Sequence, residues 1–425
     1  MIDARVDARA RALRSVRSRR VVLQTAGLGL AAATLHGWRG AAAQNATPAA
    51  GTPLAAPTGT IDRAAVAAAL PQLTALAEKT IASGAVPGLA LAVVFQDEVA
   101  LTAGYGVRST ASGEPVDADT LFQLASLAKP VGSTVVSAIV GQGAAAWDDP
   151  VSLHLPAFRL SDPWATQELT IGDFYAHRSG FGGDAGGDLE RLGYDRDAIV
   201  ERLRFLELAS SPRTTYAYSN MGLTVGGLAA AAANGMTWED ASAKLVYEPL
   251  GMTRTSSRYA DFEAADNRAE LHVRIGDAWE PKFTFDPDAE APAGGVSSTA
   301  NDLARWLRLL LGDGTVDGRA LIPAAALEEA RKPRMDLGPL PVSGNPNFYG
   351  YGWGIEYRHD GRTMLRHAGA FSVGARTMVM LLPEERLGVA VLANAFPTGV
   401  PDGLALSLFD FVLLGRLSRD WIAGW

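Results

Sequence analysis

The sequence predicts an α+β fold in which an antiparallel sheet, built from both ends of the chain and flanked by helices, carries an inserted all-helical lobe. Two strand-like runs near the start, 88–95 and 99–106, are separated by a short polar link and indicate a hairpin. Strand-like runs return only in the last third, joined by short polar turns as in an antiparallel meander. Helical patterns dominate between the two groups, so strands and helices do not alternate as they do in parallel α/β folds.

The first helix is predicted over about 61–83, where apolar residues recur near helical spacing. The hairpin follows it, and a second helix starts at Ser126. Its apolar run ends at Gly141 and Gly143. We place the end of the helix there, because glycine commonly terminates a helix. The remaining predicted elements are helices at 223–233 and 238–246, strands at 353–357, 363–367, 375–382 and 387–394, and a final amphipathic helix at about 403–417.

Residues 61–425 are predicted to form one domain, because no internal repeat and no second linker divides them. We expect its α/β lobe at about 61–120 and 290–425 and its helical lobe at about 121–289. The chain contains no cysteine, which excludes disulfides, thiolate catalysis and cysteine-ligated metal sites. No spacing of histidines and carboxylates suggests a metal site, and we expect neither a metal nor a cofactor.

Residues 1–43 have the features of a twin-arginine signal peptide. Arg19 and Arg20 precede an apolar stretch, and Ala41-Ala42-Ala43 supplies an Ala-x-Ala cleavage site. The apolar stretch is shorter than the roughly twenty residues that span a bilayer, so a retained membrane anchor is the minor alternative. We expect export to the periplasm or the medium, with no stable membrane insertion after cleavage. Residues 44–60, rich in Ala, Pro, Thr and Gly, predict a flexible linker.

Removal of residues 1–43 would leave 30 Lys and Arg against 44 Asp and Glu, a formal net charge of −14. Such an acidic surface repels nucleic acid, and no basic stripe with interleaved aromatic residues occurs. We therefore expect no nucleic-acid partner. The sequence carries no signal for a particular oligomeric state.

Ser126 stands three residues before Lys129 at the start of the second helix. On a helix the two side chains share a face, close enough for the amine to take the hydroxyl proton. The chain has only five lysines, and Lys129 is the only one with a serine at this spacing. Pro130 fits there because the first backbone N–H groups of a helix have no partner within it. Ser-x-x-Lys alone is equally compatible with an exposed lysine on an ordinary amphipathic helix.

The Gly-x-Ser-x-Gly elbow of α/β-hydrolases does not occur in this chain. Ser126-x-x-Lys129 is instead joined by Tyr218-Ser219-Asn220 and His367-Ala368-Gly369. Together these segments resemble the three motifs of the serine β-lactamase and penicillin-binding-protein superfamily: Ser-x-x-Lys, Tyr-x-Asn, and Lys-Thr-Gly or His-x-Gly. The chain is most similar in this respect to the class C β-lactamase-related esterases and peptidases, and the resemblance runs from about residue 65 to 415.

The resemblance implies a β-lactamase/transpeptidase-like fold with Ser126 in a cleft between the two lobes. Ser126 would be the nucleophile that forms an acyl-enzyme, and Lys129 and Tyr218 would share the general-base work. Lysine can act as a base only if burial and neighbours lower its pKa toward about 7–8. Tyr218 in turn needs a nearby cation to favour its phenolate, and Lys129 is the expected one.

The same resemblance assigns the rest of the site. The backbone N–H groups of Ser126 and Ala370 would form the oxyanion hole. Asn220 would contact the substrate or Lys129, and His367 and Gly369 would line the substrate side. We expect His177 to brace a loop near the cleft, and we assign no chemistry to the other histidines, His154, His272 and His359.

His367 stands where most β-lactamases and DD-peptidases of the superfamily carry a lysine that helps to bind the substrate carboxylate. An imidazole that titrates near neutrality holds such a charge only in part. We therefore expect an esterase-like serine hydrolase whose partner is a small-molecule ester or related acyl compound. A D-amino-acid-specific peptidase or weak β-lactamase, acting on a peptide or β-lactam-like substrate, is the alternative. A non-catalytic cell-wall-binding protein is a third reading, against which the intact Ser126, Lys129 and Tyr218 argue.

Overall fold

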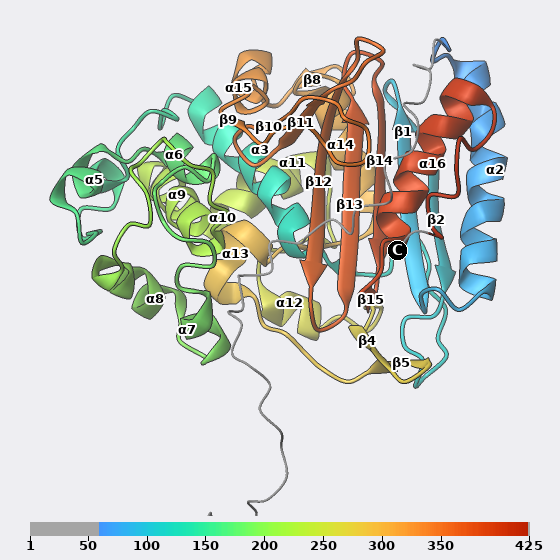
Figure 1. Ribbon diagram of the computed structural model, residues 1–425, viewed down its shortest axis with the longest axis horizontal. Coiled ribbons are helices and arrows are strands. Elements are labelled where there is room, and N and C mark those ends of the chain that lie inside the picture. Colours follow the sequence, from blue (N-terminus) through green and yellow to red (C-terminus); the bar gives the residue numbers. More distant parts are fainter. Residues whose placement is uncertain (1–58, 424–425) are drawn as a thin grey trace, which may run out of the picture. The chain divides into compact units, whose positions relative to one another are not determined.

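The computed structural model describes residues 59–423; the predicted signal peptide, and the predicted linker up to residue 58, lie outside the described residues. The described chain contains an eight-stranded antiparallel sheet with the strand order β2-β1-β14-β13-β12-β11-β10-β9 (Figure 1). Strands β1 (Gly88–Phe95) and β2 (Glu98–Gly106) form the predicted hairpin. Since β1 pairs with β14 (Leu387–Ala393), the sheet joins both ends of the domain, which confirms the predicted fold class.

The predicted strands of the last third are all present in this sheet. Strand β12 continues four residues beyond the predicted end at residue 367, so it includes Gly369 and Ala370. Two short strands, β9 and β10, were not predicted. The C-terminal strands other than β14 are β9 (Met335–Asp336), β10 (Asn347–Tyr349), β11 (Gly354–Tyr357), β12 (Thr363–Phe371) and β13 (Ala375–Leu382).

Helices α2 (Arg63–Ala82) and α16 (Val400–Leu414) pack against each other on one face of the sheet, at the right of Figure 1. The Asp62 side chain accepts a hydrogen bond from the Ala65 N–H at 2.8 Å, which caps α2 at its first turn. Alternate residues of β1, such as Leu89 and Leu91, are buried against these two helices. Helix α16 begins three residues before its predicted start.

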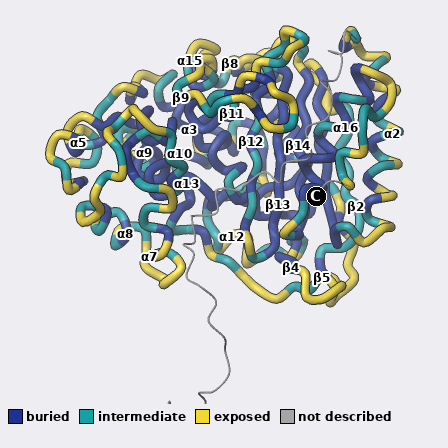
Figure 2. The backbone as a smooth tube through the Cα atoms, in the orientation of Figure 1, coloured by how far each residue is buried: buried dark blue, intermediate teal, exposed yellow. Residues whose placement is uncertain are grey.

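The other face of the sheet is covered by α14 (Ala300–Leu311), which was not predicted, and by α3 (Ala128–Gly141). The indole N–H of Trp306 in α14 donates to Thr134 Oγ1 of α3 at 3.1 Å. The Trp306 ring also stacks on Trp353, with 6.0 Å between ring centroids. Figure 2 shows the central strands of the sheet and most of α3 as buried backbone, whereas the edge strand β2 is intermediate or exposed.

The regular structure of residues 121–289 is mostly helical, but the segment also contains three short strands. Strand β3 (Phe122–Gln123) pairs with β6 (Ser297–Ser298). Strand β4 (His272–Ile275) pairs with β5 (Ala278–Pro281) and, in parallel, with β15 (Ala395–Phe396). The inserted segment is therefore not entirely helical. Its strand β4 pairs with β15, a short strand near the C-terminal end of the chain.

Helices α5 to α10 of the inserted segment lie together at the left of Figure 1, and α12 lies below the sheet. None of the helices in residues 59–423 is long and apolar enough to span a bilayer. The segment contains α4 (Val151–His154), α5 (Pro163–Glu168), α6 (Ile171–Tyr175), α7 (Gly187–Arg191), α8 (Arg196–Arg202), η2 (Leu203–Phe205), α9 (Asn220–Ala233), α10 (Trp238–Ser242), the π turn η3 (Ala243–Tyr247), α11 (Glu248–Leu250), α12 (Tyr259–Glu263) and part of the η4 turn. The remaining elements are η1 (Ala125–Leu127), η4 (Asp288–Glu290), α13 (Ala291–Gly294), β7 (Thr315–Val316), β8 (Arg319–Ala320) and α15 (Ala324–Ala330).

Candidate active site

Ser126 lies in the short turn η1, which leads directly into α3, so the predicted helix start is correct to within two residues. Hydrogen bonds hold the residue before the turn from two sides: the Leu124 N–H donates to the Val296 carbonyl at 2.9 Å, and Thr377 Oγ1 donates to the Leu124 carbonyl at 2.7 Å. Ala125 has a φ of +49°, in the left-handed region that L-residues rarely adopt. Such strain costs about 1–3 kcal/mol and persists only where the surroundings fix the backbone. The turn that presents Ser126 is therefore held rigidly.

Lys129 is fully buried in the first turn of α3. Its Nζ lies 3.0 Å from Ser126 Oγ, 2.7 Å from Asn220 Oδ1 and 3.0 Å from the carbonyl oxygen of Ala293. Burial lowers the pKa of Lys129 to about 7, which is the condition for a lysine to act as a base near neutrality.

The partners of Lys129 also orient its neutral form. A neutral amine has two hydrogens and one lone pair, and the oxygens of Asn220 and Ala293 can only accept hydrogen bonds. When these two oxygens take the two hydrogens, the lone pair is left for the Ser126 hydroxyl proton. The arrangement suits proton transfer from Ser126 to Lys129.

The Tyr218 hydroxyl donates a hydrogen bond to Ser126 Oγ at 2.8 Å. Lys129 Nζ lies over the Tyr218 ring, 4.5 Å from its centroid. Burial raises the pKa of Tyr218 well above its usual value. The expectation that Lys129 favours a phenolate is therefore wrong, because the desolvation of a buried phenolate outweighs the neighbouring groups. Tyr218 meets the nucleophile as a neutral hydrogen-bond donor.

His177 braces the segment that carries Tyr218. Its Nδ1 accepts a hydrogen bond from the Ser219 N–H at 3.2 Å, and its carbonyl accepts one from the Ala217 N–H at 2.8 Å. Its ring packs on Tyr218, with 4.4 Å between ring centroids. Burial holds the pKa of His177 well below its usual value, so the ring is neutral. These contacts agree with the structural role predicted for this residue.

His367 does not present a charge to the site. Its Nδ1 lies 2.8 Å from the Ala368 carbonyl and its Nε2 lies 2.9 Å from the Tyr349 hydroxyl. Because the carbonyl can only accept, Nδ1 carries the hydrogen and Tyr349 donates to Nε2. Burial and the nearby Lys129 lower the pKa of His367 to about 3. The expectation that this imidazole titrates near neutrality is therefore wrong.

Gly369 brings strand β12 into contact with the turn of the nucleophile. A Cβ at this position would lie 2.2 Å from the Leu124 carbonyl oxygen and 2.9 Å from the Leu127 nitrogen, so only glycine fits. The next residue of β12, Ala370, consequently lies beside η1. The pairing of the Ser126 and Ala370 N–H groups as an oxyanion hole stays a prediction.

Two glutamates near Lys129, the buried Glu290 and the half-buried Glu190, were not predicted. Burial raises the pKa of Glu290 to about 7, and a hydrogen bond from Asn220 and the charge of Lys129 act in the opposite direction. Burial and Glu290 raise the pKa of Glu190 to about 9. Glu290 directly precedes the segment of small residues that supplies the Ala293 carbonyl. Its position next to that segment is the one sequence signal that could have indicated a glutamate near Lys129.

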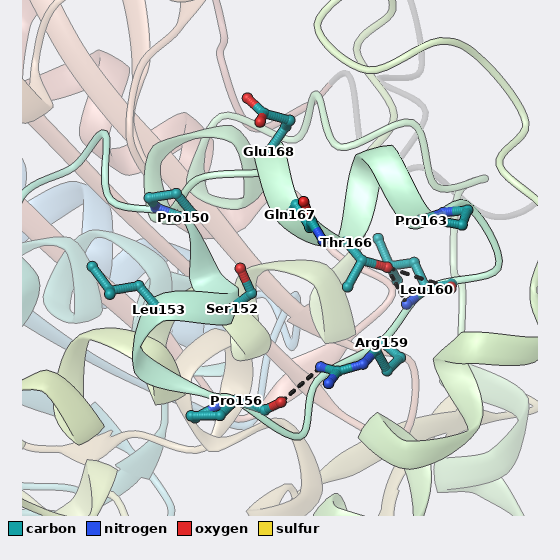
Figure 3. Close-up of a pocket in the computed structure, with 10 residues that line it drawn as sticks. All are labelled: Pro150, Ser152, Leu153, Pro156, Arg159, Leu160, Pro163, Thr166, Gln167 and Glu168. Atoms are coloured by element: carbon teal, nitrogen blue, oxygen red, sulfur yellow. Dashed lines mark hydrogen bonds between the residues drawn. The ribbon is translucent and has the colours of Figure 1, made fainter.

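A groove of about 660 Å³ on the surface of the helical lobe is separate from these residues. It is formed by α4, α5 and the turn between them, and none of the candidate site residues lines it (Figure 3). Within residues 59–423, no group of three or more His, Cys, Asp and Glu side chains is arranged to hold a metal ion.

The chain is similar to several known proteins. A family model described as Beta-lactamase matches residues 73–408. Penicillin-binding protein 4 of Amycolatopsis lactamdurans is 29% identical over 344 residues, which cover 78% of this chain and 86% of that protein. Esterase EstB of Burkholderia gladioli is 27% identical over 394 residues, which cover 83% of this chain and 96% of that protein. Unguisins hydrolase ungD of Aspergillus violaceofuscus is 28% identical over 346 residues, 76% of this chain and 60% of that longer protein.

A solved structure, that of the octameric penicillin-binding protein homologue from Pyrococcus abyssi, superimposes with a TM-score of 0.67 at 20% sequence identity. The match covers 82% of this chain and 78% of that chain, and it shows the β-lactamase/transpeptidase-like fold. Since the family model spans most of the sequence and its relatives include hydrolases, the chain belongs to the Beta-lactamase family, in the serine β-lactamase and penicillin-binding-protein superfamily, and is a serine hydrolase.

Proposed function

We propose that this serine hydrolase acts on carboxylic esters or related acyl compounds through an acyl-enzyme on Ser126. One observation carries the proposal: Ser126 Oγ contacts Lys129 Nζ at 3.0 Å and the Tyr218 hydroxyl at 2.8 Å, while the other partners of Lys129 leave its lone pair for the serine proton. A base and a neutral hydrogen-bond donor thus meet at one nucleophilic oxygen.

Acylation begins when the Ser126 proton moves to Lys129 Nζ and Oγ forms a bond to the substrate carbonyl carbon. The resulting oxyanion is to be held by the Ser126 and Ala370 N–H groups. As the carbon–oxygen bond to the leaving group breaks, the leaving alkoxide takes the Tyr218 hydroxyl proton, and Lys129 returns a proton to the phenolate. Water then gives a proton to Lys129 and attacks the acyl-enzyme. As the bond between the acyl carbon and Ser126 Oγ breaks, Lys129 returns that proton to Oγ and the carboxylic acid leaves.

The uncharged His367 supports an ester over an anionic substrate. Its two ring nitrogens are engaged by Ala368 and Tyr349, so this motif offers no fixed positive charge to a substrate carboxylate. The carboxylate form of Glu290, near Lys129, likewise disfavours an anion. The similarity to esterase EstB agrees with this choice.

A D-amino-acid-specific peptidase or weak β-lactamase is the second candidate, which the similarity to penicillin-binding protein 4 favours. We also propose that the protein is exported, on the strength of Arg19-Arg20 and the Ala-x-Ala site in the sequence. Cell fractionation of the producing organism tests the export directly, and a protein found only in the cytoplasm contradicts it.

Hydrolysis of a short-chain nitrophenyl ester, a chromogenic cephalosporin and a D-Ala-D-Ala peptide, measured side by side, tests the substrate class. We expect ester turnover that disappears in Ser126→Ala and exceeds turnover of the other two substrates. A preference for the cephalosporin or the peptide moves the assignment to the second candidate. Equal inactivity of wild type and Ser126→Ala toward all three contradicts the proposal.

A further inference from the structure

Glu290 is a buried carboxyl group in the neighbourhood of Lys129 for which the reaction described above has no use. The residue is only 4% exposed, in the turn η4 that precedes α13. Its side chain folds back on Gly294, where a Cβ would lie 2.5 Å from Glu290 Oε1. Its other oxygen, Oε2, is buried and has no hydrogen-bond partner among the described residues. A buried carboxyl group in this state needs either a proton or an opposite charge close by.

The side chains that face Glu290 come from four segments. Glu190 in α7 is a second carboxyl group, and its Oε1 is likewise buried without a partner in the described part of the chain. Asp184, before α7, adds a further negative charge, and Tyr218 is neutral. The positive groups are Arg191 and Lys129. Asp286 adds a negative charge near Glu190.

Arg191 is already committed to two other carboxylates. Its guanidinium pairs with Asp184 and with Asp188, each at 2.6 Å. Lys129 pairs with no carboxylate directly, since its three hydrogen-bond partners are Ser126, Asn220 and Ala293. Lys129 is therefore the group whose charge Glu290 influences most.

The segment from Glu290 to Gly294 connects the two groups. The Ala293 carbonyl accepts a hydrogen bond from Lys129 Nζ at 3.0 Å, and the Glu290 side chain folds back on Gly294, the next residue of the chain. The same short segment thus contacts Lys129 through its backbone and holds the Glu290 carboxyl group close by.

We propose that Glu290 is a positioning residue that acts through Lys129: its carboxylate, held by the segment that contacts the lysine, controls when Lys129 is neutral and can receive the proton of Ser126. This inference rests on the proposed function of Lys129 as the base. A carboxylate on Glu290 favours the ammonium form of Lys129, so removal of that charge makes the neutral amine available at lower pH. A nearby opposite charge typically moves a titration by about 1–3 pH units.

The test is a titration of the five lysines in full-length protein labelled with ¹³C at Cε, followed by NMR, with Lys129→Arg to assign the Lys129 signal. We expect the Lys129 midpoint to fall by at least about one pH unit in Glu290→Gln. Glu201→Gln is the matched control, because Glu201 is an exposed carboxylate of the same lobe that pairs with Arg204. The acid limb of Ser126-dependent ester hydrolysis should move with the Lys129 midpoint in Glu290→Gln and stay in place in Glu201→Gln.

A folded Glu290→Gln protein whose Lys129 midpoint is unchanged or higher overturns the inference. If that variant does not fold, the reciprocal measurement decides: Lys129→Met removes the positive charge and must raise the Glu290 carboxyl midpoint, followed by ¹³Cδ of glutamate, and an unshifted Glu290 overturns the inference. A purely structural role predicts lower turnover with no shift of either midpoint. The titrations need no substrate, so absence of ester turnover in wild type contradicts the proposed function separately.

Discussion

At the scale of single residues, the proposed mechanism divides the work at Ser126 between two side chains. Lys129 is a buried amine whose hydrogens are occupied by oxygen acceptors, and Tyr218 is a buried phenol that keeps its proton. The two groups look alike as candidate bases in the sequence, but burial acts in opposite senses on them. It removes the charge of a lysine and prevents the charge of a tyrosine. Their roles as base and acid follow from this difference.

Replacing Tyr218 with phenylalanine separates these roles. The ring that packs on His177 remains, and only the hydroxyl that donates to Ser126 Oγ is lost. We expect kcat for ester hydrolysis to fall by about 10²–10⁴-fold, the usual contribution of one acid–base group. Steady-state kinetics measures the effect, with Tyr194→Phe at an exposed tyrosine as the control. A kcat within a factor of three of wild type would rule out the acid role.

The pH dependence of activity follows from Lys129. Because the neutral amine accepts the proton and the pKa of Lys129 is about 7, kcat/KM should rise with pH up to about 7 and then level off. Below the pKa the rate should fall about tenfold per pH unit. Lys129→Arg should abolish turnover across this range, because a guanidinium stays protonated. A pH–rate profile without an acid limb between pH 5 and 8 contradicts this assignment.

At the scale of elements, contact between β12 and η1 sets the geometry of the site. Gly369→Ala would place a Cβ 2.2 Å from the Leu124 carbonyl oxygen and 2.3 Å from Thr377 Oγ1, so the strand and the turn must separate. We expect a loss of about 1–3 kcal/mol in unfolding free energy and a larger relative loss of kcat. Denaturant unfolding and ester kinetics measure the two effects. Gly182→Ala, whose nearest contact would be 3.7 Å away, is the control, and equal behaviour of both variants would refute the argument.

The long elements could be predicted because their sequence pattern matches their burial. Strands β1, β13 and β14 are buried on both faces, so they appear as continuous apolar runs. Strands β9 and β10 have only two and three residues, too few for a periodic pattern. Helix α14 was not predicted, although Leu303, Leu307 and Leu310 recur at helical spacing and are buried.

The motif residues of the site could be predicted, but their charge states could not. Ser126, Lys129, Tyr218 and Asn220 meet as their motifs suggest. The neutral forms of His367 and Tyr218 depend on burial by segments far away in the sequence, such as β10 for His367. Glu290 was missed for the same reason, because its nearness to Lys129 exists only after η4 folds against α9.

At the scale of the whole domain, the site places neutral histidines in its interior, and this has a consequence for acid stability. Between about pH 3 and 6.5 an unfolded chain protonates His367 while the folded protein does not, so the unfolded state binds more protons and unfolding free energy must fall with falling pH. From pH 6.5 to 4.5 this residue alone accounts for about 2 kcal/mol, because the full slope of about 1.36 kcal/mol per pH unit is reached only below the pKa of the unfolded state. His177 acts in the same direction.

Urea unfolding of wild type and His367→Gln across this pH range tests the argument. The free energy of unfolding should depend less steeply on pH in the variant, whatever the stability of the variant at pH 7. His359→Gln, at an exposed histidine, should keep the wild-type slope. Parallel curves for wild type and His367→Gln would mean that His367 is charged in the folded protein, and the argument for an uncharged third motif would fail with it.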